Sequence, residues 1–366
     1  MLLKSRGIIS RLLGIGRAYH IPVMREECCN YLQITAGGVY VDCTVGGGGH
    51  THEILSRGGK VIGLDQDMDA ISETTRRLSN YVSEGSLELH HTNFQNIVPV
   101  VQSSSLRARC SSSGLVDGVL LDLGVSSFQI DNPSRGFAFR LEDCPLDMRM
   151  NTSTHNNITA AHLLNSLDTE ELADIFYVYG DVSSSRMIAR EIVASRPVTE
   201  SSDVVKIIAR LVPDKYLTKT LARCFQALRI VVNKEMESLE KVLSEVHHIV
   251  RPSGRLVVLS YHSHEDRQVK DLFRRRVVAD RDTSVGSCEV SLEWNRNDEI
   301  DSIDNDIVPL SIRKRDTAVN CVWKAVTKKP ISPTRSEISR NSRARSAKLR
   351  VGERTVKTDI GGTITM

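Results

Sequence analysis

Four consecutive glycines at positions 46–49 are the first feature of the sequence that could bind a ligand. They follow a β-branched stretch, 38–44, which ends in Asp42, Cys43 and Thr44. Glycines at a strand-to-helix turn let the backbone approach a ligand closely and direct helix N-terminal N–H groups toward it. Because four glycines cost much conformational entropy on folding, a turn without a ligand is the weaker interpretation.

The spacing of this loop separates two ligand classes. The dinucleotide pattern G-x-G-x-x-G would begin at Gly46 but has Thr51 where the third glycine belongs. The order acid-x-Thr-x-Gly-x-Gly, from Asp42 to Gly48, instead suits a nucleoside without a pyrophosphate, such as S-adenosyl-L-methionine. Asp65 ends the next predicted strand, where a carboxylate can accept hydrogen bonds from both ribose hydroxyls.

An aromatic residue follows the third predicted strand. Phe94 could lie along an adenine ring, and the more ordinary interpretation is an aromatic of the core.

These residues lie where the strands of an alternating β/α pattern should end. Strands are predicted at 38–44, 60–64, 87–91, 116–123 and 255–260, with helices at 50–56, 69–78 and 265–276. Such alternation predicts an α/β fold with a doubly wound parallel sheet.

The β/α alternation stops between Leu123 and Arg255. The stretch between these residues is much longer than the roughly 30 residues that a βαβ crossover needs. This stretch is predicted to be helical at 159–167, 169–179, 183–195 and 202–211. We therefore expect a helical insertion at 136–222 within a discontinuous sheet domain at 20–135 and 223–350. A helix at 225–250 should pack its apolar stripe on the sheet; its apolar residues are Leu228, Val231, Val232, Leu239 and Val242.

The C-terminal part of the chain gives weaker signals. We expect a loop at 280–309, an edge strand at 320–328 and an extended, basic stretch from Pro330. Residues 351–366 form a tail.

The charge of the chain is concentrated at its ends. The 366 residues carry 48 Lys+Arg and 45 Asp+Glu, a net charge of +3. Residues 1–19 contribute +4 and residues 324–350 contribute +8, which leaves −9 for the rest. Because 1–19 contains no acid, it resembles a mitochondrial (matrix) targeting segment; the alternative is a basic extension of a bacterial cytoplasmic protein.

We expect neither a membrane-spanning segment nor a metal site. No apolar run approaches the roughly 20 residues of a membrane span. The eight cysteines show neither CxxC pairing nor metal-ligand spacing, so we expect free thiols and no metal site.

Eight sequence blocks run in order over about nine-tenths of the chain. They are HIPVMREE (20–27), VDCTVGGGGHT (41–51), LLDLGVSSFQID (120–131), SRGFAFR (134–140), PLDMRM (145–150), FQALRIVVNKE (225–235), SYHSHEDRQVK (260–270) and NSRARSAKLR (341–350). These blocks resemble the MraW-type small-subunit rRNA cytosine-N4 methyltransferases, and the N-terminal extension resembles their mitochondrial members. Departures such as His264 and Ser342 leave the cofactor positions intact.

The resemblance implies a doubly wound, Rossmann-like methyltransferase domain with a helical insertion that helps hold RNA. It implies S-adenosyl-L-methionine as cofactor and small-subunit rRNA, or the ribosomal subunit, as partner. The oligomeric state is not implied. The positions that match cofactor contacts of the family are Gly48, Gly49, His50, Asp65, Phe94, Asp122 and Gln129.

Methylation of an exocyclic amine requires groups that accept its hydrogens and align it with the methyl donor. Asp122, after the fourth strand, is the predicted acceptor, or else a contact to the cofactor alone. Secondary candidates are His262, Glu265 and Asp266, and Arg343, Arg345, Lys348 and Arg350 are expected at RNA phosphates. Alternatives are methylation of another RNA or of DNA, and a ribosome-assembly factor that binds RNA without essential turnover.

Overall fold

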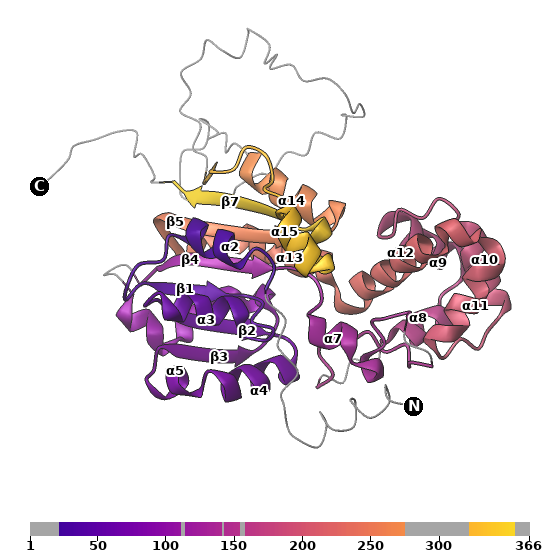
Figure 1. The fold of residues 1–366 in the computed structure, drawn as a ribbon, viewed down its shortest axis with the longest axis horizontal. Helices are drawn as coiled ribbons and strands as arrows, with labels where there is room; N and C mark the ends of the chain where they lie inside the picture. The colour runs from indigo at the N-terminus through magenta and orange to yellow at the C-terminus, as the bar shows by residue number, and fades with distance from the viewer. Residues whose placement is uncertain (1–21, 111–113, 141–142, 154–157, 275–321, 356–366) are drawn as a thin grey trace, which may run out of the picture.

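The computed structural model describes residues 22–110, 114–140, 143–153, 158–274 and 322–355. Figure 1 shows a twisted sheet covered by helices and, to one side, a separate group of helices from the middle of the chain. The predicted leader at 1–19, the predicted loop at 280–309 and most of the predicted tail lie outside the described residues.

Within the described residues, seven strands form one sheet in the order β3-β2-β1-β4-β5-β7-β6. The first five are parallel, and they wind outward in both directions from the neighbours β1 and β4. The predicted α/β, doubly wound class is therefore confirmed. The strands are β1 (Val39–Asp42), β2 (Lys60–Asp65), β3 (Leu87–His91), β4 (Val116–Asp122), β5 (Val250–Ser260), β6 (Trp323–Ala325) and β7 (Lys348–Arg354).

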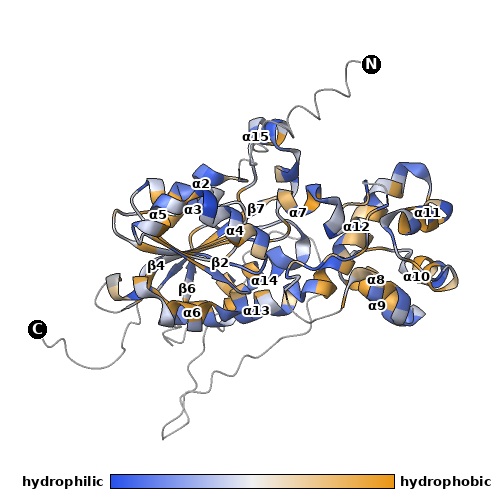
Figure 2. Ribbon diagram, turned by 90° about the horizontal axis from the view of Figure 1, so that it is seen from below, coloured by the Kyte–Doolittle hydropathy of each residue, from blue (hydrophilic) through white to orange (hydrophobic). Residues whose placement is uncertain are grey.

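Helices cover both faces of the sheet (Figure 2). On one face α2 (Arg25–Leu32) and α3 (Gly49–Ser56) bury Cys28 and Ile54 against the strands. On the other, α6, α13 and α14 bury Ile97, Val242 and Phe273. The bounds of these and the remaining helices are α4 (Met68–Arg77), α5 (Ser79–Ser83), α6 (Ile97–Ser103), α7 (Ser127–Asp131), α13 (Glu235–Glu245), α14 (Ser263–Arg274) and α15 (Arg335–Arg340), with short 3-10 helices η1 (Phe94–Asn96), η2 (Ser105–Arg109), η3 (Pro133–Arg135), η4 (Val246–His248) and η5 (Ser342–Ser346).

The insertion has a hydrophobic core of its own. Five helices surround buried residues such as Leu164, Phe176, Ile192 and Ile208. All four helices predicted within 159–211 are present, with ends that differ by one or two residues. The five are α8 (Ala160–Ser166), α9 (Thr169–Val178), α10 (Ser185–Ala194), α11 (Ser201–Leu211) and α12 (Asp214–Asn233).

The predicted single helix at 225–250 is wrong, because the structure has two helices there. α12 ends before Lys234, whose φ of 50° lies in the left-handed region, and α13 starts at the next residue. The turn sends Leu228 into the core of the insertion, whereas Leu239 packs on the sheet. The predicted stripe is thus divided between two cores, and α12 crosses the boundary expected at 222.

The basic C-terminal stretch was predicted as extended, and its end is an interior strand of the sheet. β7 runs antiparallel between β5 and β6, so the predicted end of the domain at 350 falls within a strand. The predicted edge strand is confirmed as β6, shorter than expected. Among the described helices none is long and apolar enough to cross a membrane.

Candidate functional site

A cavity of about 700 Å³ opens at the carboxyl ends of β1, β2 and β4. β1 and β4 are the neighbours from which the chain winds outward, and open α/β sheets bind ligands at this switch point. The volume lies within the range of small-molecule and cofactor sites. Residues from the glycine loop, α7, α12, α13 and η5 complete its wall.

The glycine loop is held closed by the carboxylate of Asp65, the last residue of β2. Asp65 accepts hydrogen bonds from the backbone N–H groups of Gly46 and Asp67, both at 2.8 Å. Thr74 donates its hydroxyl to the carbonyl of Gly46 at 3.0 Å. Loop and carboxylate therefore form one unit at the end of the two strands.

The glycines serve two purposes: Gly48 and Gly49 allow close packing, and Gly46 adopts a positive φ. A Cβ atom on Gly48 would lie 2.9 Å from Thr74, and one on Gly49 would lie 2.7 Å from Pro22, so both keep the loop tightly packed. A Cβ on Gly46, whose φ is +51°, would meet no atom closer than 3.9 Å. Gly46, Gly47 and Gly49 line the cavity, and Gly48 is the N-cap residue directly before α3.

The residues present fit S-adenosylmethionine. Asp65 lines the cavity, and each of its carboxylate oxygens can accept a second hydrogen bond, as ribose hydroxyls require. Phe94 and Leu123 bring apolar surface to the same cavity. Burial raises the pKa of Asp65 to about 7, so hydroxyl donors would stabilise its charged form.

Gln129 lies at the cavity, but hydrogen bonds within the protein occupy its side chain. Its amide donates to Asp67 at 2.7 Å and its oxygen accepts from the N–H of Ser126 at 2.9 Å. A matching bond from the Gln129 N–H to the Ser126 hydroxyl completes a capping box that starts α7. Gln129 therefore fixes the wall of the cavity.

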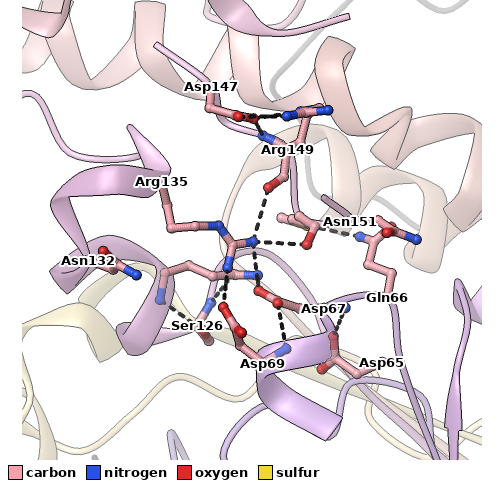
Figure 3. A network of polar contacts seen from close by, with 12 residues as sticks. Asp65, Gln66, Asp67, Asp69, Ser126, Asn132, Arg135, Asp147, Arg149 and Asn151 are labelled. Carbon is pink, nitrogen blue, oxygen red and sulfur yellow. Dashed lines mark hydrogen bonds and ion pairs between the residues drawn. The ribbon is translucent and has the colours of Figure 1, made fainter. Parts of the chain in front are cut away.

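A buried arginine joins the sheet domain to the segment that leads into the insertion (Figure 3). Arg135 is 6% exposed and forms ion pairs with Asp67 at 2.8 Å and Asp69 at 3.1 Å. It also donates to the carbonyls of Arg149 and Met150. Since buried charges need such compensation, this network fixes the two parts against each other.

Asp122 sits at the end of β4 and faces the cavity. Its carboxylate accepts a hydrogen bond from the Tyr261 hydroxyl at 2.7 Å, and its other oxygen lies 3.6 Å from Nδ1 of His50. The N–H of Asp122 donates to Thr44 at 2.7 Å. Burial raises the pKa of Asp122 to about 7, which is suitable for a proton acceptor near neutral pH.

Charged residues of α12, α13 and α14 complete this side of the cavity. Arg229 binds Glu235 through two hydrogen bonds of 2.8 and 2.9 Å. Glu265 accepts from the N–H of Tyr261 at 2.8 Å and lies 3.1 Å from Nε2 of His262. Burial raises the pKa of Glu265, but its contact with His262, the Arg229 charge and the N–H of Tyr261 outweigh burial and lower the pKa.

Glu235, His262 and Glu265 lie close enough together to hold a metal ion. Arg229 already neutralises Glu235, and Glu265 is bonded to backbone N–H groups, so the protein itself satisfies the two carboxylates. The expectation of no metal remains a prediction.

Four basic residues were expected to contact RNA phosphates, and they have different surroundings in the structure. Arg350 is wrong as a phosphate contact, because it is 8% exposed and pairs with Asp266 at 2.6 Å. Lys348 lies 3.3 Å from the same carboxylate, which also removes Asp266 from the candidate catalytic residues. Arg343 lies at the rim of the cavity and pairs with Asp131, and Arg345 is exposed.

Sequence reasoning missed Tyr261, Arg229, Glu235 and Asn233, all of which line the cavity. They belong to two of the quoted sequence blocks, 225–235 and 260–270, so a signal existed. The sequence did not indicate the bend at Lys234, which brings residues 225–235 to the end of β4.

Comparison with known proteins agrees with this geometry. The family model described as the MraW methylase family matches residues 17–290 and 297–355. A protein named Ribosomal RNA small subunit methyltransferase H from Carboxydothermus hydrogenoformans is 41% identical over 341 residues, covering 92% of this chain and 97% of that protein. Proteins of the same name from Clostridium botulinum (39% identical; 91% and 97% covered) and Mesoplasma florum (36% identical; 92% and 99% covered) are also similar.

A strand-end cavity closed by a glycine loop and a carboxylate is what a methyl donor of the nucleoside type requires, and the matches extend over both parts of the sheet domain and the whole insertion. The chain belongs to the MraW methylase family and is an S-adenosylmethionine-dependent methyltransferase.

Proposed function

We propose that the protein methylates the exocyclic amine N4 of a cytidine in small-subunit ribosomal RNA. The relatives' shared name supports the RNA. The observation that carries the choice of an amine is Asp122, a cavity-facing carboxylate held by Tyr261 and with a pKa raised to about 7. Such a group can accept a hydrogen bond from an amine and then its proton.

The glycine loop and Asp65 would hold the cofactor, with Phe94 beside its adenine. When bound, it supplies an electrophilic methyl group on a sulfonium. Asp65 would accept hydrogen bonds from ribose hydroxyls while it keeps the loop closed through Gly46. The tight packing of Gly48 and Gly49 fixes where the loop ends and α3 begins.

Asp122 would act on the target amine. The lone pair of a cytosine amine is delocalised into the ring, and a hydrogen bond from the amine to a carboxylate draws the nitrogen toward the tetrahedral geometry that can attack. Tyr261 fixes one oxygen of Asp122, because the high pKa of this buried phenol keeps its proton in place. The second oxygen stays available for the amine. Positioning of this kind supplies much of an enzyme's acceleration.

The target base must leave its stack to reach Asp122, as in loops or after base flipping. Arg343 at the rim and the exposed Arg345 are the basic residues that we propose at neighbouring phosphates. Since the chain carries only +3 overall, this binding depends on where the charges lie.

We also propose, from the sequence of residues 1–19, that the protein acts in the mitochondrial matrix and supports assembly of the small subunit there. A reporter fused to residues 1–25 should enter mitochondria. A reporter that stays in the cytosol would reject the location and leave the enzymatic proposal untouched.

The test of the proposed reaction is nucleoside mass spectrometry of small-subunit rRNA. Depletion of the protein should remove N4-methylcytidine, and the wild-type gene should restore it. A gene that encodes Asp122→Asn should restore the level of the protein but not N4-methylcytidine. Unchanged N4-methylcytidine after depletion would refute the proposal. Restored subunit assembly by Asp122→Asn, without methylation, would favour the assembly-factor alternative for the cellular role.

A further inference from the structure

His50 is a buried residue at the bottom of the cavity whose ring nitrogens have different partners. It lies in the first turn of α3 and is 4% exposed. Nε2 lies 3.2 Å from the carbonyl oxygen of Val23. Because a carbonyl oxygen only accepts, Nε2 carries the hydrogen, and in the neutral ring Nδ1 has a free lone pair. Nδ1 lies 3.6 Å from Oδ2 of Asp122.

The two oxygens of Asp122 therefore differ. Oδ1 accepts the short bond from Tyr261, which keeps its proton. Oδ2 has His50 as its neighbour, and both residues line the cavity. A proton taken up from a ligand would thus reside on Oδ2, next to a base that can receive it. The separation of 3.6 Å is slightly longer than a hydrogen bond, as is common at catalytic contacts before substrate binds.

Four charged groups influence His50. Asp42 and Glu337 favour its protonated form, Arg25 opposes it, and Asp122 lies at the contact described. Burial dominates and lowers the pKa of His50, so the ring is neutral before the reaction and Nδ1 has a lone pair. The lowered pKa makes the ring a weaker base, but the carboxylate that Asp122 becomes on transfer lies beside the ring and favours its protonated form. Asp42 is itself fixed by Thr51, whose hydroxyl donates to it at 2.7 Å. A proton on His50 would therefore have a fixed carboxylate nearby to offset its charge.

We propose that His50 receives, through Asp122, the proton that the target amine loses. This rests on the proposed methylation of an amine. The nitrogen gains the methyl group while the sulfur keeps the electron pair of the broken bond, and the nitrogen then releases one proton to Oδ2 of Asp122. Asp122 passes it to Nδ1 of His50 and becomes a carboxylate again. After the product leaves, the proton returns through Asp122 to water.

His50 is a positioning residue in this scheme, because it reaches the amine only through Asp122. Its test is His50→Asn, which keeps a polar side chain but cannot take up a proton, with His52→Asn as the control on an exposed face of the same helix. We expect kcat to fall about 10–100-fold in His50→Asn, with the KM for S-adenosylmethionine within about two-fold. The Asp122→Asn/His50→Asn double variant should be no slower than Asp122→Asn.

Two kinetic results would overturn the proposal. A raised KM for S-adenosylmethionine with unchanged kcat would make His50 a cofactor contact, and rate losses that multiply in the double variant would show that His50 acts without Asp122.

A second measurement does not need an active variant. Histidine-selective ¹⁵N NMR of the wild-type protein, with the His52→Asn spectrum as an aid to assignment, should show His50 neutral near pH 7 with its hydrogen on Nε2. A hydrogen on Nδ1 would overturn the proposal. Nucleoside analysis separates the two proposals: a methyl group on a base carbon or a ribose oxygen would refute the amine chemistry, whereas the NMR result concerns His50 alone.

Discussion

The two sides of the cavity are built differently. The cofactor side consists of the glycine loop and Asp65, which lie within 24 consecutive residues, 42–65, and are joined mainly through backbone N–H groups. The target side consists of Asp122, Tyr261 and the Arg229–Glu235 pair, from three distant parts of the chain, joined through side chains. The first is set by local turn geometry, whereas the second depends on how the insertion packs.

This difference implies that the two sides should fail separately. A substitution on the cofactor side should lower the affinity for S-adenosylmethionine, because the glycine loop and Asp65 are proposed to bind it. Damage to the target side should appear as lost turnover, since Asp122 interacts most strongly with an amine that is losing its proton.

The largest effect is expected for Asp122→Asn. Loss of the proton acceptor should lower kcat by about 10²–10⁴, with the Kd for S-adenosylmethionine changed only a few-fold. Single-turnover kinetics and calorimetry measure the two quantities. Asp174→Asn, at an exposed position on α9, is the matched control. A large loss of affinity with unchanged kcat would move Asp122 to the cofactor side.

Arg135→Met tests the network that joins the two parts of the fold. It leaves Asp67, whose side chain is 3% exposed, without its ion pair, so the free energy of unfolding should fall by about 3–5 kcal/mol. Denaturant titration checks this. The exposed Arg140, five residues along the chain, provides the control Arg140→Met, which should change stability by no more than about 0.5 kcal/mol. Equal stability of the two variants would contradict the role of the network.

Asp65→Asn should break the cofactor side alone. Both carboxylate oxygens accept N–H groups, so one N–H would face the new amide NH₂. We expect the Kd for S-adenosylmethionine to rise about 10–100-fold, or roughly 1.4–2.7 kcal/mol, with kcat at saturation within a few-fold. The Asp174→Asn control should bind normally. A fall in kcat of the size expected for Asp122→Asn would mean that the two sides are not independent.

The smallest effect is expected in how the free energy of unfolding depends on pH. It tests whether Asp122 is a partly desolvated acid. Its pKa is about 7 when folded, against 3.8 as the ordinary value, so its contribution is fully present below pH 4 and is lost as the pH rises to 7. The neutral Asp122→Asn should therefore gain stability relative to wild type between pH 4 and 8. We expect about 1–2 kcal/mol, because the side chain is 22% exposed and solvent screens part of the penalty. A pH-independent difference in thermal denaturation would contradict the raised pKa.

The same contrast explains what the sequence could predict. Strand ends follow from local patterns, so the C-terminal ends of β1 to β5 were predicted to within two residues, although β5 begins five residues earlier than expected. The glycine loop and Asp65 lie at these strand ends. The apolar residues of 225–250 satisfy one long helical stripe, and nothing in their periodicity indicates that Lys234 adopts a left-handed conformation. Arg350 resembles the other basic residues of its block, and only the packing of β7 against α14 pairs it with Asp266.

The antiparallel strand β7 has a consequence for synthesis on the ribosome. The chain completes β5 at Ser260, but the strand that covers the outer edge of β5 ends at Arg354. At translation rates of about 5–20 residues per second, the edge of β5 stays uncovered for roughly 5–20 s in the nascent chain. An open edge of apolar strand invites pairing with other chains. Ribosomes that stall or terminate within this interval would release a sheet that lacks its β7 and is prone to aggregate, so expression should depend on uninterrupted translation of the last hundred codons.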